Sequence, residues 1–146
     1  MQENKKIESI ITSFREVSKA FYKQMWHNAN DLGVTTLQLQ IMKLLEEQPE
    51  LGLVEIANKL NNSKSTISGT VERLVKAGYV ERTRSEQDRR AIVLTLTEAG
   101  VKKKKESYKS YLERMEGLKE INDQDVEKLV ELHSLILTKI SDNGDE

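Results

Sequence analysis

The stretch Leu53–Leu96, LVEIANKLNNSKSTISGTVERLVKAGYVERTRSEQDRRAIVLTL, decides the fold of this chain. Up to Ala77-Gly78 its apolar residues recur every three or four positions, which is the spacing of one helix face. Beyond Gly78 the spacing becomes that of a strand, because Ile92, Leu94 and Leu96 alternate with Val93 and Thr95. The pattern therefore predicts two short helices followed by two strands, and the rest of the chain extends from this segment.

Local signals place the boundaries of these elements. The first helix covers Leu53–Leu60, and the polar turn Asn61-Asn62-Ser63 ends with a serine that can cap the next helix. Gly78 ends that helix because it readily adopts a left-handed conformation. Strands follow at about Tyr79–Arg84 and Ala91–Leu96, and the polar loop Ser85–Arg90 between them should project outward. This order of elements is that of a winged helix-turn-helix.

Helices flank this segment on both sides. One is expected from about Lys6 to Asn28, a second from Thr35 or Thr36 to the stop at Pro49, and a third from near Ala99 to Met115. A last helix carries the apolar stripe of Val126–Ile140, and an acidic tail of six residues, SDNGDE, should fray at the end of the chain. We therefore expect a mainly α protein with a small two- to three-stranded β wing.

Composition limits the chemistry that the chain can perform. The 146 residues contain no cysteine, which excludes disulfides, thiol redox switches and cysteine-ligated zinc. The N-terminal sequence lacks the layout of a signal peptide, and no apolar run approaches the roughly 18 residues of a spanning helix. The expectation is a soluble, cytoplasmic protein that makes no contact with a membrane.

The net charge of −1 conceals a strong asymmetry along the chain. The segment from Lys59 to Lys105 carries 12 Lys or Arg against 5 Asp or Glu, a net charge of +7, whereas the remainder carries −8. A basic centre between acidic ends indicates a polyanionic partner, and double-stranded DNA is the one we predict.

The helix that begins after Ser63 has a face suited to a DNA groove. If Ile67, Val71, Leu74 and Val75 are buried, small polar residues and cations remain on the outside. Thr66 and Thr70 flank that face and are placed to reach phosphates, and Ser63 caps the helix that carries it. The alternative is an ordinary solvated helix face. The outward residues are Lys64, Ser65, Ser68, Gly69, Glu72, Arg73 and Lys76.

The hairpin loop and a lysine block are further basic features. Arg84, Arg89 and Arg90 suit a narrow minor groove, and Asp88 could orient the Arg90 guanidinium by a bidentate pair. An ordinary charged hairpin is the alternative. For Lys102–Lys105 a solvated helix face is the favoured interpretation, since a helical run of four points in all directions.

Three segments together resemble the MarR-type winged helix-turn-helix transcriptional regulators. They are LGLVEIANKL (51–60), SKSTISGTVERLVKAGYVER (63–82) and DRRAIVLTLTEAG (88–100), and the resemblance covers about Leu37–Gly100 closely. It implies a homodimer on a pseudo-palindromic operator, with Ser63–Lys76 in the major groove and the Arg84–Arg90 wing in the minor groove. Gly69 departs from the family pattern because many relatives carry arginine there.

The terminal helices themselves indicate a homodimer. The apolar stripes of Ile7–Met25 and Val126–Ile140 cannot both be covered by the small winged core, whereas two-fold pairing would bury them. The alternative is a monomer that folds these helices onto its core. The expected organisation is a single domain, 1–146, with a DNA-binding lobe at about 36–97 and a helical dimerisation region at about 4–30 and 98–141.

The resemblance also implies a small-molecule effector, commonly a small aromatic or phenolic anion. Tyr22, Met25, Trp26 and His27 are the lining residues we predict, although aromatic residues at helical spacing often belong to a core. No cofactor is expected. With His27 and His133 as the only histidines, no metal site is expected either.

Rival functions are less well supported by the sequence. No nucleophile with a base, metal cluster or phosphate-binding loop is visible, so the chain is not expected to be an enzyme and has no predicted catalytic residue. A winged-helix module for protein interaction would not require the basic centre. We therefore predict a ligand-responsive repressor; a transcriptional activator without a small-molecule effector is the remaining alternative.

Overall fold

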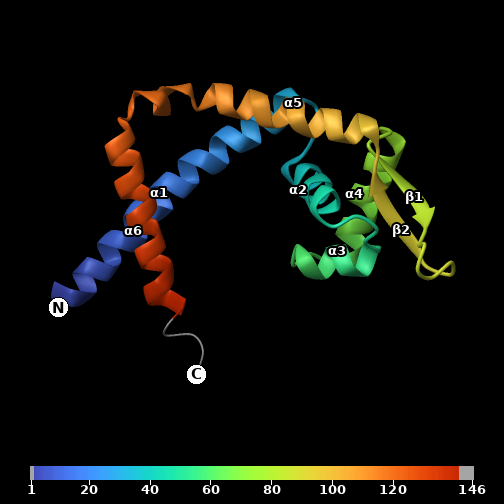
Figure 1. Ribbon diagram of the computed structural model, residues 1–146, viewed down its shortest axis with the longest axis horizontal. Coiled ribbons are helices and arrows are strands. Elements are labelled where there is room, and N and C mark those ends of the chain that lie inside the picture. Colours follow the sequence, from blue (N-terminus) through green and yellow to red (C-terminus); the bar gives the residue numbers. More distant parts are fainter. Residues whose placement is uncertain (1, 142–146) are drawn as a thin grey trace. The chain divides into compact units, whose positions relative to one another are not determined.

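The computed structural model describes residues 2–141 and confirms a mainly α fold with a small β wing (Figure 1). The chain divides into two compact units, 1–112 and 113–146. The elements are α1 (Gln2–Asp31), α2 (Thr36–Glu47), α3 (Leu53–Lys59), α4 (Lys64–Lys76), β1 (Val80–Arg84), β2 (Ile92–Leu96), α5 (Glu98–Arg114), the 3-10 helix η1 (Glu116–Glu120) and α6 (Asp123–Ser141).

Local signals account for the ends of α1 and α2. Helix α2 begins with a capping box in which the Gln38 N–H donates to Thr35 Oγ1 (3.1 Å) and the Thr35 N–H donates to Gln38 Oε1 (2.8 Å). Helix α1 is longer than the predicted Lys6–Asn28 because no helix breaker precedes Gly33. At Gly33 the backbone turns left-handed (φ +70°), and the chain enters α2.

The predicted helix-turn-helix is present in α3 and α4. Asn61 takes a left-handed conformation (φ +49°), and the Asn62 N–H donates to the Ala57 carbonyl (2.9 Å). The Thr66 N–H then donates to Ser63 Oγ (3.1 Å), so Ser63 is the N-cap of α4 as predicted. At the other end Gly78 is left-handed (φ +82°), which confirms its predicted role in ending the helix.

Strands β1 and β2 form an antiparallel hairpin. The register pairs Val80 with Leu96 and Arg84 with Ile92. An isolated bridge, in which the Leu94 N–H donates to the Leu51 carbonyl (2.8 Å), adds a third short stretch of chain to this sheet. Figure 1 shows the β1–β2 loop extending beyond α2, α3 and α4. The hairpin therefore projects from the lobe, as the sequence predicted.

One apolar core holds α2, α3, α4 and the sheet together. Each fully buried Leu, Ile or Val side chain contributes about 1.5–3 kcal/mol relative to an exposed one. Val75 was expected in this core but is only half-buried, because it lies at the edge of the face that α4 turns inward. The buried members are Ile41, Met42, Leu45, Leu51, Ile56, Ala57, Ile67, Val71, Leu74, Val80 and Leu94.

Helix α5 is joined to the lobe at its first turn. The Thr97 hydroxyl donates to the Gly78 carbonyl (2.6 Å) and accepts the Gly100 N–H (3.1 Å), so one side chain caps α5 and ties it to the end of α4. Gly100 is buried against the Tyr79 carbonyl so closely that a Cβ would overlap it. The start of α5 is thus fixed to the lobe by backbone proximity.

The second unit contains η1 and α6. Asn122 caps α6 by accepting the Asp125 N–H at Oδ1 (2.9 Å). Among its described residues the apolar stripe of α6 is largely exposed, and Ile140 retains 66% of its accessible surface. Ser141 is the last residue of α6, and the rest of the predicted acidic tail lies outside the described residues.

Candidate nucleic-acid interface

Ser63 and Thr66 at the start of α4 are engaged in capping. The Ser63 hydroxyl donates to Thr66 Oγ1 (2.7 Å) and accepts the Thr66 N–H, so the two side chains hold each other across the first turn. Both residues are exposed, and they lie beside the exposed Lys64 and Ser65. The first turn of α4 therefore presents hydroxyls and one cation in a fixed arrangement.

Thr70 is the one predicted site residue that faces the interior. It retains 7% of its accessible surface, and its hydroxyl donates to the Thr66 carbonyl at 2.8 Å. The expectation that Thr70 flanks the outward face and reaches a phosphate is wrong. Threonine in a helix commonly satisfies its hydroxyl on the carbonyl four residues back, which allows it to replace an apolar residue on a buried face.

The rest of the predicted outward face lies on the surface. Lys64, Ser65, Gly69, Arg73 and Lys76 are exposed, and Ser68 is half-buried. No atom lies within 4 Å of the position that a Cβ on Gly69 would occupy. The centre of this face consequently carries only small side chains and is open to solvent, whereas the long cationic side chains are restricted to its two ends.

Arg82 on β1 is a cation that the sequence interpretation did not assign to the site. Its Nη2 lies 3.8 Å from Glu72 Oε2 on α4, and both side chains are substantially exposed. The contact links β1 to the outward side of α4 and partly neutralises the only acidic residue on that helix. Strand alternation would place Arg82 on the same face as the buried Val80, so the local sequence indicates neither its exposure nor a partner on α4.

The wing loop is held by contacts among its own residues. Arg84 Nη1 donates to the Arg89 carbonyl (3.2 Å), which connects the base of the loop to its tip. Ser85 Oγ accepts the N–H groups of Gln87 (3.2 Å) and Asp88 (3.3 Å). The Ala91 N–H donates to the Asp88 carbonyl (3.0 Å). These contacts give a solvent-exposed loop a defined shape.

Asp88 acts on the backbone of Arg90, not on its guanidinium. Asp88 Oδ1 accepts the Arg90 N–H at 3.1 Å, and the ion pairs found among residues 2–141 do not include one between these two side chains. The expected bidentate pair is therefore not present. The Asp88 carboxylate instead stabilises a turn of the loop by accepting the backbone N–H two residues later. Arg89 and Arg90 are left exposed at the tip of the wing.

The lysine block at the start of α5 is divided between structure and solvent. Lys104 Nζ lies 2.8 Å from Glu46 Oε2 on α2, so this lysine helps to hold α5 on the lobe. Lys102 and Lys105 are exposed, as a solvated helix face requires. The block does not form a single cationic surface.

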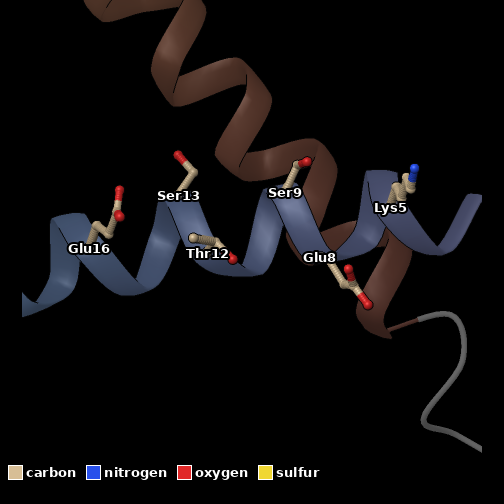
Figure 2. Close-up of a pocket in the computed structure, with 6 residues that line it drawn as sticks. All are labelled: Lys5, Glu8, Ser9, Thr12, Ser13 and Glu16. Carbon is tan, nitrogen blue, oxygen red and sulfur yellow. The ribbon is translucent and has the colours of Figure 1, made fainter. Parts of the chain in front are cut away.

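The predicted effector residues occupy the last turns of α1. Tyr22 and Trp26 are exposed, Met25 is half-buried, and the Trp26 and His27 rings meet edge to face with centroids 5.2 Å apart. A hollow elsewhere on α1 includes none of these four residues, and its polar side chains point to different sides of the helix (Figure 2). They are Lys5, Glu8, Ser9, Thr12, Ser13 and Glu16.

A groove on the lobe separates the start of α4 from the wing. It is lined by the first turn of α3, by Lys64 and Arg82, and by residues of β2 including Ile92 and Leu94. Within residues 2–141, no three His, Asp or Glu side chains are grouped as metal ligands would be. No helix in that range is both long and apolar enough to span a bilayer.

The fold and this surface define the class of protein as a winged helix-turn-helix. The MarR family model matches residues 34–92. FarR of Neisseria gonorrhoeae, an HTH-type transcriptional regulator, is 30% identical over 137 residues, which cover 92% of this chain and 85% of FarR. The chain therefore belongs to the MarR family of transcriptional regulators.

Other proteins are similar to this chain in sequence or in fold over different lengths. YfiV of Bacillus subtilis, an uncharacterized HTH-type regulator, is 39% identical over 67 residues, which span 46% of this chain and 42% of YfiV. A MarR family protein from Bacillus stearothermophilus has the same fold (TM-score 0.83, 17% identity, 94% of this chain and 97% of that one). A mutant MepR from S. aureus, bound to an oligodeoxyribonucleotide, does too (TM-score 0.65, 21% identity, 90% and 97%).

Proposed function

We propose that the protein is a homodimeric, sequence-specific DNA-binding regulator that represses transcription and responds to a ligand. The observation that carries the proposal is the exposed, capped face of α4 beside the projecting wing, whose tip carries Arg89 and Arg90. The basic excess of Lys59–Lys105 supports a polyanionic partner. The MepR relative was solved with an oligodeoxyribonucleotide, which favours DNA over a protein partner.

The two exposed elements suit different grooves of DNA. A major groove about 12 Å wide admits a helix, and the low centre of α4 at Gly69 allows its backbone to approach base edges. Ser65 and Arg73 on this face offer base contacts, whereas Lys64 and Lys76 suit phosphates. Arg90 at the wing tip suits the minor groove, where the negative potential is strongest.

A homodimer would bring two such surfaces to one operator. Phe14 on α1 retains 65% of its accessible surface, and the neighbouring stripe residues Ile10, Ile11 and Val17 are exposed as well. Apolar surface of this extent on a terminal helix is typical of an interface. Two-fold pairing would place the recognition helices roughly 34 Å apart, one turn of DNA, as a pseudo-palindromic operator requires.

The ligand response is assigned to the end of α1. Tyr22, Met25, Trp26 and His27 lie next to the buried Asn28 and Ala29, where α1 meets the rest of its unit. Aromatic rings that also carry O–H and N–H groups are suited to a small aromatic or phenolic anion. A ligand that bound there would act on the connection between α1 and the lobe, and relief of repression is the expected result.

The proposal is tested by selecting genomic DNA fragments with the purified full-length protein. We expect a recurring two-fold symmetric sequence whose affinity falls steeply with salt, since each neutralised phosphate releases counterions. Neighbouring genes would then suggest candidate effectors. Retention of no sequence, or binding that is insensitive to salt, would favour a protein-interaction module instead. Reporter activity with the selected operator separates a repressor from an activator.

A further inference from the structure

Asn28 is an unusual polar residue in the first unit because its side chain is almost completely buried. It retains 2% of its accessible surface at the end of α1 and faces α5. Burying an amide is costly unless its hydrogen bonds are replaced. Here they are replaced by partners far away in the sequence, on a different helix. A buried amide with satisfied hydrogen bonds adds little net stability, but it specifies one arrangement of the two helices that it joins.

Both ends of the Asn28 amide bind α5. Asn28 Nδ2 donates to the Ser107 carbonyl at 2.9 Å, and the Ser110 hydroxyl donates to Asn28 Oδ1 at 2.6 Å. Ser107 is itself 4% exposed. Because a planar amide has its donor and acceptor on opposite sides, these two bonds fix the rotation of α1 about this point as well as its distance from α5. We refer to these three residues as the Asn28 clamp.

The clamp lies where a long helix meets a fixed one. Among the described residues of α1, only Asn28 and Ala29 are buried, so the preceding 26 residues extend away from this point over about 40 Å. Helix α5 is fixed to the lobe by Thr97, Gly100 and the Lys104–Glu46 ion pair. A rotation of about 5° at Asn28 would therefore displace the far end of α1 by about 3.5 Å, the rise of one base pair.

We propose that Asn28 is a positioning residue that sets the half-site spacing which the dimer accepts. The inference rests on the proposed function, in which α1 pairs with the partner and α4 reads DNA. With α1 held in the dimer, a change of angle at the clamp moves each lobe, and α4 with it, relative to the two-fold axis. Asn28 itself is buried, so its proposed effect on DNA binding is indirect.

The test uses wild-type protein and Asn28→Ala on duplexes that carry the selected half-sites at the natural spacing and at one or two base pairs more or less. Wild type is expected to bind well only at the natural spacing. Asn28→Ala should lose about tenfold in affinity there, a size typical of changes remote from a ligand, and should discriminate much less among spacings. Asn30→Ala, an exposed neighbour at the end of α1, is the matched control and should keep the wild-type profile.

Ser110→Ala keeps the proposal testable if Asn28→Ala does not fold. Ser110 is half-buried, and its replacement removes one of the two hydrogen bonds of the clamp. We expect this variant also to discriminate less among spacings than wild type, but by a smaller amount than Asn28→Ala. The inference would be overturned if both variants had lower thermal stability but the same preference for spacing as wild type. It would also be overturned if the loss of affinity were explained by dissociation of the dimer. If wild type bound no duplex at all, the proposed function would fail instead, which is a separate result.

Discussion

At the scale of single residues, the outward face of α4 combines long cations with unusually small neighbours. Ser65, Ser68 and Gly69 form its low centre, and Arg73 follows one helical turn after Gly69. Few side chains here are long enough to make a bidentate contact with a base. Sequence discrimination by α4 should accordingly depend strongly on Arg73.

Replacing Arg73 tests this dependence. Arg73→Ala should weaken binding to the selected operator by about 1–3 kcal/mol and relax the preference at one base position in each half-site, because a bidentate arginine contact distinguishes guanine from other bases. Binding to a set of single-base operator variants measures both effects. Lys43→Ala, an exposed lysine on α2, is the control and should bind like wild type. An unaltered base preference would remove Arg73 from the reading face.

Two glycines make a matched pair for stability. Gly69→Ala should raise the free energy of unfolding by about 1 kcal/mol, since a Cβ meets no atom within 4 Å and alanine is the better helix former. Gly100→Ala should lower it by about 1–3 kcal/mol because the Cβ would overlap the Tyr79 carbonyl. Urea unfolding of wild type and the two variants measures these changes in the free energy of unfolding. A destabilised Gly69→Ala protein would indicate that α4 makes a close contact at this position.

At the scale of elements, the wing is organised by its own hydrogen bonds. Arg84 was predicted to contact DNA, but its guanidinium donates to the Arg89 carbonyl, and Asp88 binds the backbone of Arg90. These contacts position the tip, whereas Arg89 and Arg90 remain exposed at its surface. We therefore expect two kinds of arginine in one hairpin, one that supports the loop and one that binds DNA.

Salt dependence separates these two kinds. Arg90→Ala should weaken operator binding and reduce the slope of log affinity against log salt by about 1, because one cation fewer then displaces counterions from the minor groove. Arg84→Gln should weaken binding but leave the salt slope unchanged. The loop loses the hydrogen bond to the Arg89 carbonyl, whereas no side chain that contacts DNA is removed. Both variants should remain dimeric and folded. Equal reductions in slope would show that Arg84 also contacts DNA.

At the scale of the whole molecule, the apolar stripes of α1 and α6 are the basis of the proposed dimer. In the first unit, Phe14 and its neighbours on α1 are exposed, and in the second unit the same holds for most of the stripe on α6. The organisation predicted from the sequence, a lobe at 36–97 between dimerisation helices, stays a prediction. So do the cytoplasmic location and the absence of enzymatic activity.

A charge on the stripe tests the dimer. Phe14→Glu should convert the protein to a monomer, since pairing would bury an unpaired carboxylate, while helix content by circular dichroism should change little. Thr12→Glu places the same charge on the opposite side of α1 and should leave the dimer intact. Sedimentation velocity measures both. A dimeric Phe14→Glu protein would direct the search for the interface to another surface.

Much of the fold could be predicted because its signals are local. Ser63 caps α4, Gly78 ends it, and β2 contains the alternating residues Ile92, Leu94 and Leu96, all signals that extend over a few positions in the sequence. The exposed positions of Lys64 and Arg73 followed from helical periodicity, and that of Arg90 followed from its place in a polar loop. Thr70 was misplaced because periodicity treats a hydroxyl as polar, whereas a helix can satisfy it internally.

The sequence by itself determined the order of elements, the buried apolar residues Ile67, Val71 and Leu74 of α4, and the family, since each depends on residue types at short and regular spacing. The tertiary structure alone decided which polar groups meet: Arg82 with Glu72, Lys104 with Glu46, and Asn28 with Ser107 and Ser110. Such contacts join different elements, in the Asn28 clamp across about 80 residues of chain. They form only after the apolar core has brought the elements together, so no local pattern encodes them.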